Sequence, residues 1–295
     1  MSFANLKRSR SNFDKLTKEL EKVSTPTTSQ NLSQDDRFWK PELDKSGNGY
    51  AVIRFLPAIE GEELPWARVW SHAFQGPGGW YIENSLTTLG NKDPVSEENT
   101  RLWNTGVESD KEIARKRKRK LSYYSNVLMV SDPKHPENEG KVFLFKFGKK
   151  IFDKITEAMQ PAFEDETPIN PFDFWKGANF KLKIRKVDGF WNYDKSEFEA
   201  VAQIAKDDDT IKGIWTRQYP LKPFLDPTNF KTYDELKEKL NRVISGTKST
   251  ETVENVDLPP KSDGKVKSTE QSAPSTSVGD KSEDNLDYFS KLAEE

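Results

Sequence analysis

The chain has 295 residues, of which 34% are hydrophobic and 32% charged, so its length allows one large domain or two ordinary ones around a modest core. It has no cysteine, which excludes disulfides and thiolate chemistry, and no apolar run long enough to span a membrane, so we expect a soluble, intracellular protein. Its aromatic residues (8 Trp, 8 Tyr and 18 Phe) exceed the needs of such a core, and we expect some of them at a binding surface.

Charge is distributed unevenly along the chain. Residues 246–295 contain 6 Lys and 11 Asp or Glu, a net charge of −5, whereas the whole chain carries −2. The first 245 residues therefore carry +3. A mildly basic body followed by an acidic end is compatible with a polyanion as the partner of the body.

Residues 2–23 are predicted to form a short amphipathic helix. Its basic part is Lys7, Arg8, Ser9, Arg10 and Ser11, and its apolar stripe is Phe13, Leu16, Leu20 and Val23. Residues 24–34 are polar and rich in Ser and Thr, which indicates a linker. Such an arm either packs on its own core or docks on a partner surface, and the pattern leaves both alternatives open.

The body begins near Asp36 and is predicted to be mainly β with helical additions. Strands are expected over residues 50–56, 67–74, 80–84, 122–130, 141–147 and 178–187. Helices are expected over 149–160 and 232–244, the second with a capping box of Thr232 and Glu235. Residues 86–110 are interpreted as an irregular insertion with a short helix. Hairpins without a βαβ repeat favour a small antiparallel barrel.

A run of six cations leads into two tyrosines at the start of the strand 122–130. It comprises Arg115, Lys116, Arg117, Lys118, Arg119 and Lys120, followed by Tyr123 and Tyr124. Alone, such a run fits a solvated face or a nuclear-localisation signal as well as it fits a nucleic-acid site.

Two further clusters combine cations with rings. The first contains Lys146, Lys149 and Lys150 with Phe145 and Phe147, and the second contains Lys181, Lys183, Arg185 and Lys186 with Phe190, Trp191 and Tyr193. Cations attract phosphates and rings stack on bases, so three such clusters predict a groove for single-stranded nucleic acid.

The residue types required for catalysis are not grouped in the sequence. His72 lies in a predicted strand, and His135 lies in the turn between Pro133 and Pro136. The sequence from Gly148 to Lys150 has the position of a phosphate-binding loop, but Lys150 replaces the hydroxyl residue that binds Mg²⁺. The acids at 207–209 are interpreted as a solvated helix start rather than a metal site. We therefore expect no enzyme.

Residues 247–295 lack periodicity and are predicted to be a disordered acidic tail. Near its end, Leu286, Phe289 and Ala293 share one helical face among six acids and two lysines. We expect this hook to fold on a partner through Asp284, Leu286, Asp287 and Phe289.

Several motifs carry a family resemblance. They include Gly79-Trp-Tyr-Ile-Glu83, Phe147-Gly-Lys-Lys150 and Gly189-Phe-Trp-Asn-Tyr-Asp194, with residues 46–57, 122–128, 132–133, 136–143 and 177–180. Through them the chain resembles the single-stranded DNA-binding, helix-destabilising proteins of T-even-type phages. The similarity covers most of residues 40–195 in order and is weak over 197–244.

The resemblance implies three parts. Residues 1–35 would be a cooperativity arm that docks on a neighbouring protomer. Residues 36–246 would be an OB-fold core that holds single-stranded DNA, with an inserted subdomain at 85–110. Residues 247–295 would contact replication and recombination proteins. The implied function is cooperative, sequence-nonspecific coating of single-stranded DNA in phage replication, recombination and repair, in the cytoplasm of the infected bacterial host.

The resemblance also implies which rings contact DNA. Family ring positions correspond to Trp103, Tyr123, Phe190 and Tyr193, and Phe145 stands where a tyrosine is expected. Tyr123 and Tyr124 become the expected stacking pair. Two further expected tyrosines fall near Lys92 and Ile113, which are not aromatic. The cations expected to contact DNA are those of the run 115–120 with Lys149, Lys150, Lys183 and Arg185.

Well-known members of the resembled family hold a structural zinc ion with one His and three Cys. His72 matches the histidine, whereas Ser85, Asp93 and Ser96 stand at the cysteine positions. Serine is a poor zinc ligand, and one His with one Asp cannot close a tetrahedral site. We therefore expect no zinc and an insertion held by packing of Leu86, Leu89, Val95 and Leu102.

Three alternatives stay open at the level of sequence. The same groove would serve a single-stranded RNA-binding translational regulator. A nuclease site could have escaped recognition. A scaffold could use the basic run to bind an acidic protein.

Overall fold

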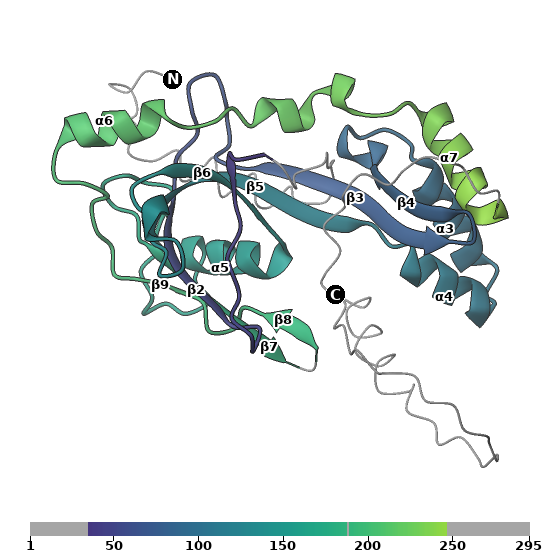
Figure 1. Ribbon diagram of the computed structural model, residues 1–295, viewed down its shortest axis with the longest axis horizontal. Helices are drawn as coiled ribbons and strands as arrows, with labels where there is room; N and C mark the ends of the chain where they lie inside the picture. The colour runs from purple at the N-terminus through teal and green to yellow at the C-terminus, as the bar shows by residue number, and fades with distance from the viewer. Residues whose placement is uncertain (1–34, 188, 247–295) are drawn as a thin grey trace, which may run out of the picture. The chain divides into compact units, whose positions relative to one another are not determined.

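The computed structural model describes residues 35–187 and 189–246 (Figure 1). The predicted arm, with Lys7, Arg8, Ser9, Arg10 and Ser11, lies outside the described residues. The predicted tail, with Asp284, Leu286, Asp287 and Phe289, also lies outside them. Both stay predictions from the sequence.

The described residues form a mixed sheet in the order β1-β6-β5-β2-β7-β8, in which β3 also pairs with β4 and β5, and β9 with β7. The strands are β1 (Phe38–Trp39), β2 (Gly49–Phe55), β3 (Ala67–Gly76), β4 (Gly79–Asn84), β5 (Lys120–Ser131), β6 (Val142–Phe147), β7 (Phe180–Val187), β8 (Phe190–Asn192) and β9 (Glu197–Phe198). Every pairing is antiparallel except that of β1 with β6. The mainly β prediction and the six expected strands are confirmed.

Helices occupy the positions between and after these strands. They are α3 (Pro94–Asn104), α4 (Glu108–Lys116), α5 (Lys149–Met159), α6 (Asp208–Thr216) and α7 (Tyr233–Ser245), with short 3-10 helices η1 (Leu86–Thr88), η2 (Pro136–Asn138), η3 (Lys222–Leu225) and η4 (Pro227–Asn229). The capping box of Thr232 and Glu235 begins α7, as predicted. The side chain of Asp207 caps α6, which confirms the helix start at 207–209. Residues 86–110 were expected to be irregular with one short helix, and α4 was not predicted.

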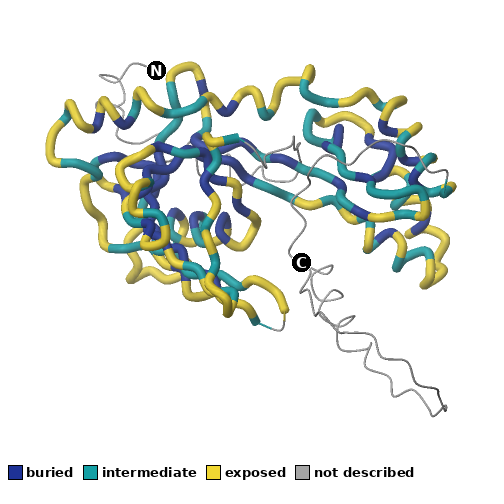
Figure 2. Tube along the Cα trace, viewed as in Figure 1, coloured by how far each residue is buried: buried dark blue, intermediate teal, exposed yellow. Residues whose placement is uncertain are grey.

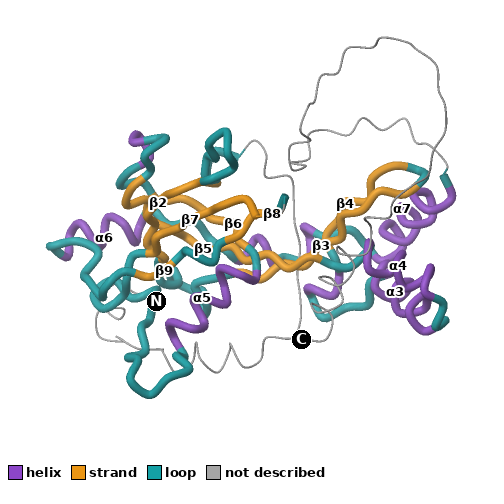
Figure 3. The backbone as a smooth tube through the Cα atoms, turned by 90° about the horizontal axis from the view of Figure 1, so that it is seen from below, coloured by secondary structure: helices purple, strands orange, loops and turns teal. Residues whose placement is uncertain are grey.

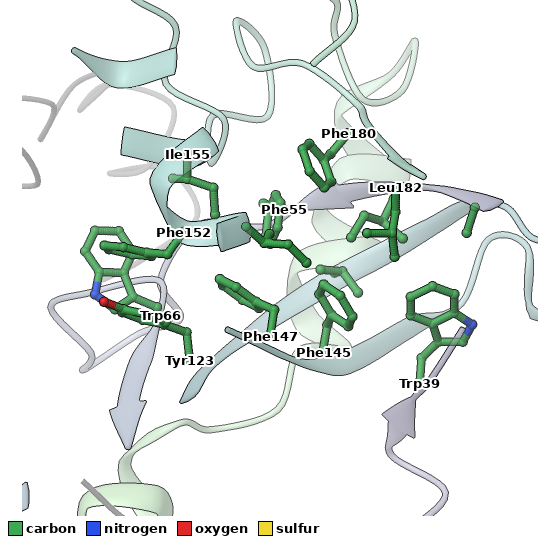
Figure 4. Close-up of a cluster of buried hydrophobic side chains, with 14 of the residues drawn as sticks. Trp39, Phe55, Trp66, Tyr123, Phe145, Phe147, Phe152, Ile155, Phe180 and Leu182 are labelled. Atoms are coloured by element: carbon green, nitrogen blue, oxygen red, sulfur yellow. The ribbon is translucent and has the colours of Figure 1, made fainter. Parts of the chain in front are cut away.

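Strand β5 is central because it pairs with β2, β3 and β6. On one of its faces lies the largest cluster of buried side chains, which α5 covers with Ile151, Phe152 and Ile155. Figure 4 shows Tyr123 of β5 beside Phe152 within this cluster. Burying one such large side chain contributes roughly 1.5–3 kcal/mol of stability.

The opposite face of β5 is covered by the segment after α6. Tyr124 lies there, and the ring of Phe224 stacks on it with a centroid distance of 4.5 Å. Asn126 of β5 exchanges two hydrogen bonds with the backbone of Tyr219, at 2.8 and 2.9 Å. Figure 2 shows the buried positions concentrated along the strands. Both faces of β5 are therefore inside the protein.

Helix α7 packs on the β3–β4 hairpin beside α3, as Figure 3 shows. Leu236, Leu240 and Val243 of α7 are buried against Phe74 and Tyr81. The hairpin turn approaches the end of α7 closely, since the backbone N–H of Gly78 donates to the carbonyl of Val243 at 2.8 Å. A Cβ at Gly78 would lie 2.2 Å from the carbonyl oxygen of Arg242.

A Gly78→Ala substitution should therefore destabilise the protein by about 1–3 kcal/mol, because backbone rather than a flexible side chain must move. Urea unfolding followed by circular dichroism measures the change. Gly213→Ala is the matched control, since nothing lies within 4 Å of its added Cβ in α6. Equal stability of the two variants would contradict the close packing of α7.

His135 bridges two carboxylates at the surface. Its Nε2 lies 2.8 Å from Glu42 Oε2, and its Nδ1 lies 3.0 Å from Glu137 Oε1. Carboxylates only accept, so both ring nitrogens donate and the imidazole is protonated in this arrangement. The hydrogen bonds that His135 donates to Glu42 and Glu137 raise the pKa of His135.

The folded pKa is raised, so the stabilisation from His135 is fully present below the ordinary histidine pKa of about 6.5 and is lost as pH rises through the folded value. We expect the melting temperatures of wild type and His135→Gln to converge as pH increases from about 6 to about 9. Thermal melts across this range measure it. A difference that grows with pH would contradict the assignment.

Candidate nucleic-acid interface

The basic run 115–120 spans the junction between α4 and β5. Arg115 and Lys116 end α4, Arg117 is its C-cap residue, and Lys120 begins β5. The prediction of a strand entrance is therefore correct only for the last part of the run. The helix places its first cations beside α3, on the side of the β3–β4 hairpin.

The side chains of the run alternate between two environments. The three arginines are half-buried and the three lysines are exposed. The Cζ atoms of Arg115, Arg117 and Arg119 lie 5.4, 5.4 and 4.4 Å from the ring centroids of Trp103, Phe74 and Trp70, respectively. A guanidinium group is weakly hydrated and stacks on rings, whereas an ammonium group keeps its water. The run thus provides three anchors and three outward cations.

The outward cations are Lys116, Lys118 and Lys120, here called the lysine row. Within residues 35–187 and 189–246, no carboxylate forms an ion pair with any of them. By contrast, Arg115 Nη1 lies 2.6 Å from Glu108 Oε1, and Arg119 Nη1 donates to Thr87 Oγ1 at 3.0 Å. Burial lowers the pKa of Arg117 and Arg119. The lysine row is the part of the run available to phosphate.

The structure corrects the predicted stacking pair. Tyr123 is 1% exposed and stacks on Phe152 at a centroid distance of 3.8 Å, and Tyr124 is 0% exposed beneath Phe224. Burial raises the pKa of Tyr123 to about 12. Successive residues of a strand point to opposite faces, and both faces of β5 are covered. Both tyrosines are therefore core residues, and so is Phe145, which is 3% exposed.

Other predicted rings are accessible. Trp103 in the last turn of α3 is 44% exposed and has Lys111 Nζ 5.9 Å from its centroid. Phe190, which follows Gly189 at the β7–β8 turn, is 55% exposed. Tyr193 is half-buried against the main core, and burial raises its pKa. Trp103 and Phe190 are thus the predicted rings best placed to stack on a base.

The exposed ring of Tyr50 was not predicted from the sequence. Tyr50 of β2 is exposed and lies opposite Lys183 of β7 in the strand register. Directly opposed residues of paired strands share a face, so this ring lies on the cationic face of β7. The continuous apolar character of residues 50–56 concealed which of them faces outward.

Three cations of β7 lie on an exposed face as predicted, but each of these three has a carboxylate partner. Lys181 pairs with Glu199 at 3.0 Å, Lys183 with Glu197 at 2.7 Å, and Arg185 binds Asp194 through two nitrogens. The hydrogen bond from Lys183 lowers the pKa of Glu197. The predicted contacts of Lys183 and Arg185 with phosphate would therefore compete with carboxylates. In the sheet, β2 separates this face from β5.

Of the two lysines that begin α5, one is paired with a carboxylate among the described residues and the other is not. Lys149 Nζ pairs with Asp153 Oδ2 at 3.0 Å, one turn along the helix. Lys150 is exposed, and the described residues include no carboxylate paired with it. Lys150 is therefore the better candidate of the two for a phosphate contact.

The positions that correspond to zinc ligands in the resembled family meet in the structure but do not fit zinc. His72 Nε2 lies 3.3 Å from Asp93 Oδ1 and 3.4 Å from Ser96 Oγ, and Ser85 Oγ bonds to Thr87. Only one His and one Asp can act as strong ligands here, and serine hydroxyls are poor ones. The described part of the chain contains no group of three or more His, Cys, Asp or Glu placed to hold a metal.

Most of the apolar side chains that were expected to hold the insertion by packing are buried. Leu86, Val95 and Leu102 are buried, whereas Leu89 is half-buried.

None of the helices within the described ranges is long and apolar enough to cross a membrane.

Comparisons with known proteins show to which family the chain is similar. Residues 47–244 match the family described as gp32 DNA binding protein like. The chain is 42% identical over 219 residues to the single-stranded DNA-binding proteins of Enterobacteria phages T2 and T4, which covers 72% of this chain and 71% of each relative. It is 44% identical over 96 residues to the single-stranded DNA-binding protein of Enterobacteria phage RB70, covering 31% of this chain and 79% of that relative.

Changing all three residues of the lysine row to Gln should weaken binding of a single-stranded oligonucleotide and reduce the slope of log K against log salt by up to about 2, since each phosphate contact on a single strand contributes about 0.7. Fluorescence titrations at several salt concentrations measure the slope. The matched control is Arg117→Lys with Arg119→Lys, which keeps the charge and should mainly lower stability. An unchanged slope in the lysine variant would contradict the assignment.

Proposed function

The chain belongs to the family of gp32-like DNA-binding proteins, and from this premise we propose that it coats single-stranded DNA, without sequence preference, during phage DNA replication, recombination and repair. Its binding would remove secondary structure, because the coated strand cannot pair. We propose no catalytic activity for it.

The observation that carries this proposal is the division of the basic run. Three arginines anchor the run on rings, Arg115 on that of Trp103, and the lysine row, which begins at the next residue, stays exposed. Ammonium groups bind phosphates of any sequence, and an exposed indole stacks on any base at roughly 1–3 kcal/mol per base. A cation row beside an accessible ring therefore supports binding to an unpaired strand.

The domain organisation is part of the proposal. We infer that the sheet is an OB-fold core, residues 36–246, with an inserted subdomain around 85–110. Residues 1–35 would provide self-association along the strand through their basic cluster, and the acidic residues 247–295 would recruit phage replication and recombination proteins. The opposite charges of these two ends support separate partners.

Quenching of tryptophan fluorescence by an oligonucleotide tests the proposal most directly. We expect oligo(dT) to quench the intrinsic fluorescence, with an affinity that falls as salt increases. A matched RNA oligonucleotide in the same titration separates DNA coating from a role as a single-stranded RNA-binding regulator. Preference for RNA, or an absence of quenching by either, would overturn the proposal.

Deletion of residues 1–23 should separate cooperativity from binding. We expect affinity for long poly(dT) to fall by roughly 10²-fold, because the contact between neighbours adds an effectively intramolecular interaction. Affinity for an oligonucleotide that holds one protomer should change little. Competition titrations with both ligands measure this, and equal losses on the two would contradict a role of the arm in self-association.

A further inference from the structure

A buried polar centre lies where β3 meets the start of α3. His72 and Asp93 are each 1% exposed, and their Nε2 and Oδ1 atoms are 3.3 Å apart. Asp93 also accepts the backbone N–H of Ser96 at Oδ1 and that of Leu86 at Oδ2, at 3.0 and 3.1 Å.

The same imidazole also contacts the basic run. His72 Nδ1 lies 2.9 Å from the carbonyl oxygen of Arg117, and Asn99 Nδ2 donates to that oxygen at 3.1 Å. A carbonyl oxygen only accepts hydrogen bonds, so Nδ1 carries the proton. Two side chains from different elements thus hold one backbone carbonyl.

Arg117 is the residue at which the basic run changes from helix to strand. It is the C-cap of α4, and it stands between Lys116 and Lys118. The direction of the peptide at Arg117 decides which way these lysines point, because side-chain directions follow the backbone. The ring of Phe74 beneath the Arg117 guanidinium holds the same residue from its side chain.

We propose that His72 is a positioning residue for DNA binding. Its close contact with Asp93 joins, without a metal, the elements that a structural metal would join at this place. Its Nδ1–H fixes the Arg117 carbonyl so that the lysine row faces the single-stranded DNA. This inference rests on the proposed function. It assigns a role to a buried histidine that cannot itself contact DNA.

Two amide variants separate the contacts of the two ring nitrogens. In His72→Asn, the amide reaches the position of Nδ1 and can still donate to the Arg117 carbonyl. In His72→Gln, the amide reaches the position of Nε2, so the contact with Asp93 can form while that with Arg117 is lost. A purely structural role predicts that affinity follows stability in both variants. A positioning role predicts that affinity follows the Arg117 contact.

The experiment measures the salt dependence of oligo(dT) binding for both variants, at a temperature where circular dichroism shows each to be folded. We expect His72→Gln to bind roughly fivefold to tenfold more weakly at low salt with a smaller slope, and His72→Asn to stay within about twofold of wild type. In a protein whose lysine row is changed to Gln, His72→Gln should cause no further loss, because it acts through those lysines.

Three results would overturn the inference. These are wild-type binding by folded His72→Gln, a loss fully additive with that of the lysine row, and stoichiometric zinc that survives dialysis against a mild chelator. Should His72→Gln fail to fold, Asn99→Leu removes the second donor to the same carbonyl, and we expect it to reduce the salt slope likewise. If wild type itself binds no single-stranded DNA, the proposed function fails instead.

Discussion

The structure depends on the burial of both faces of β5. This strand pairs with three others, and its neighbouring residues Tyr123 and Tyr124 enter two separate clusters of the interior. Helix α5 covers one face, and the segment around Phe224 covers the other. Because β5 begins at Lys120, the position of the basic run is set by a strand that cannot shift without disturbing both clusters.

The same rigidity gives the basic run its two chemical roles. The run follows α4 and meets the rings of the β3–β4 hairpin and of α3 on one side only. The three arginines of the run stack on those rings at low desolvation cost, and the three lysines that alternate with them are exposed. An Arg–Lys exchange in this run would conserve charge and still change the structure.

The charged surfaces are therefore less uniform than the sequence implies. Carboxylates of residues 194–199 pair with Lys181, Lys183 and Arg185 of β7, whereas no carboxylate among the described residues forms an ion pair with the lysine row. An exposed ion pair contributes little stability, but it removes a cation from easy use by phosphate. The lysine row at the junction of α4 and β5 therefore offers three cations to a polyanion without competition from a paired carboxylate among the described residues.

Sequence periodicity and turn residues determined the six longest strands, the helices α5 and α7, and the mainly β class, because these depend on local pattern and capping. The motifs also located the basic run and the exposed Trp103 and Phe190. Tertiary structure alone decided that Tyr123, Tyr124 and Phe145 are buried, since the segment that covers Tyr124 lies about a hundred residues further along and has no periodic signal. Tertiary structure also decided which cations are paired, because the carboxylate partners of the β7 cations come from another segment of the chain. It likewise decided what holds the Arg117 carbonyl, because the donors to that carbonyl come from other elements of the fold.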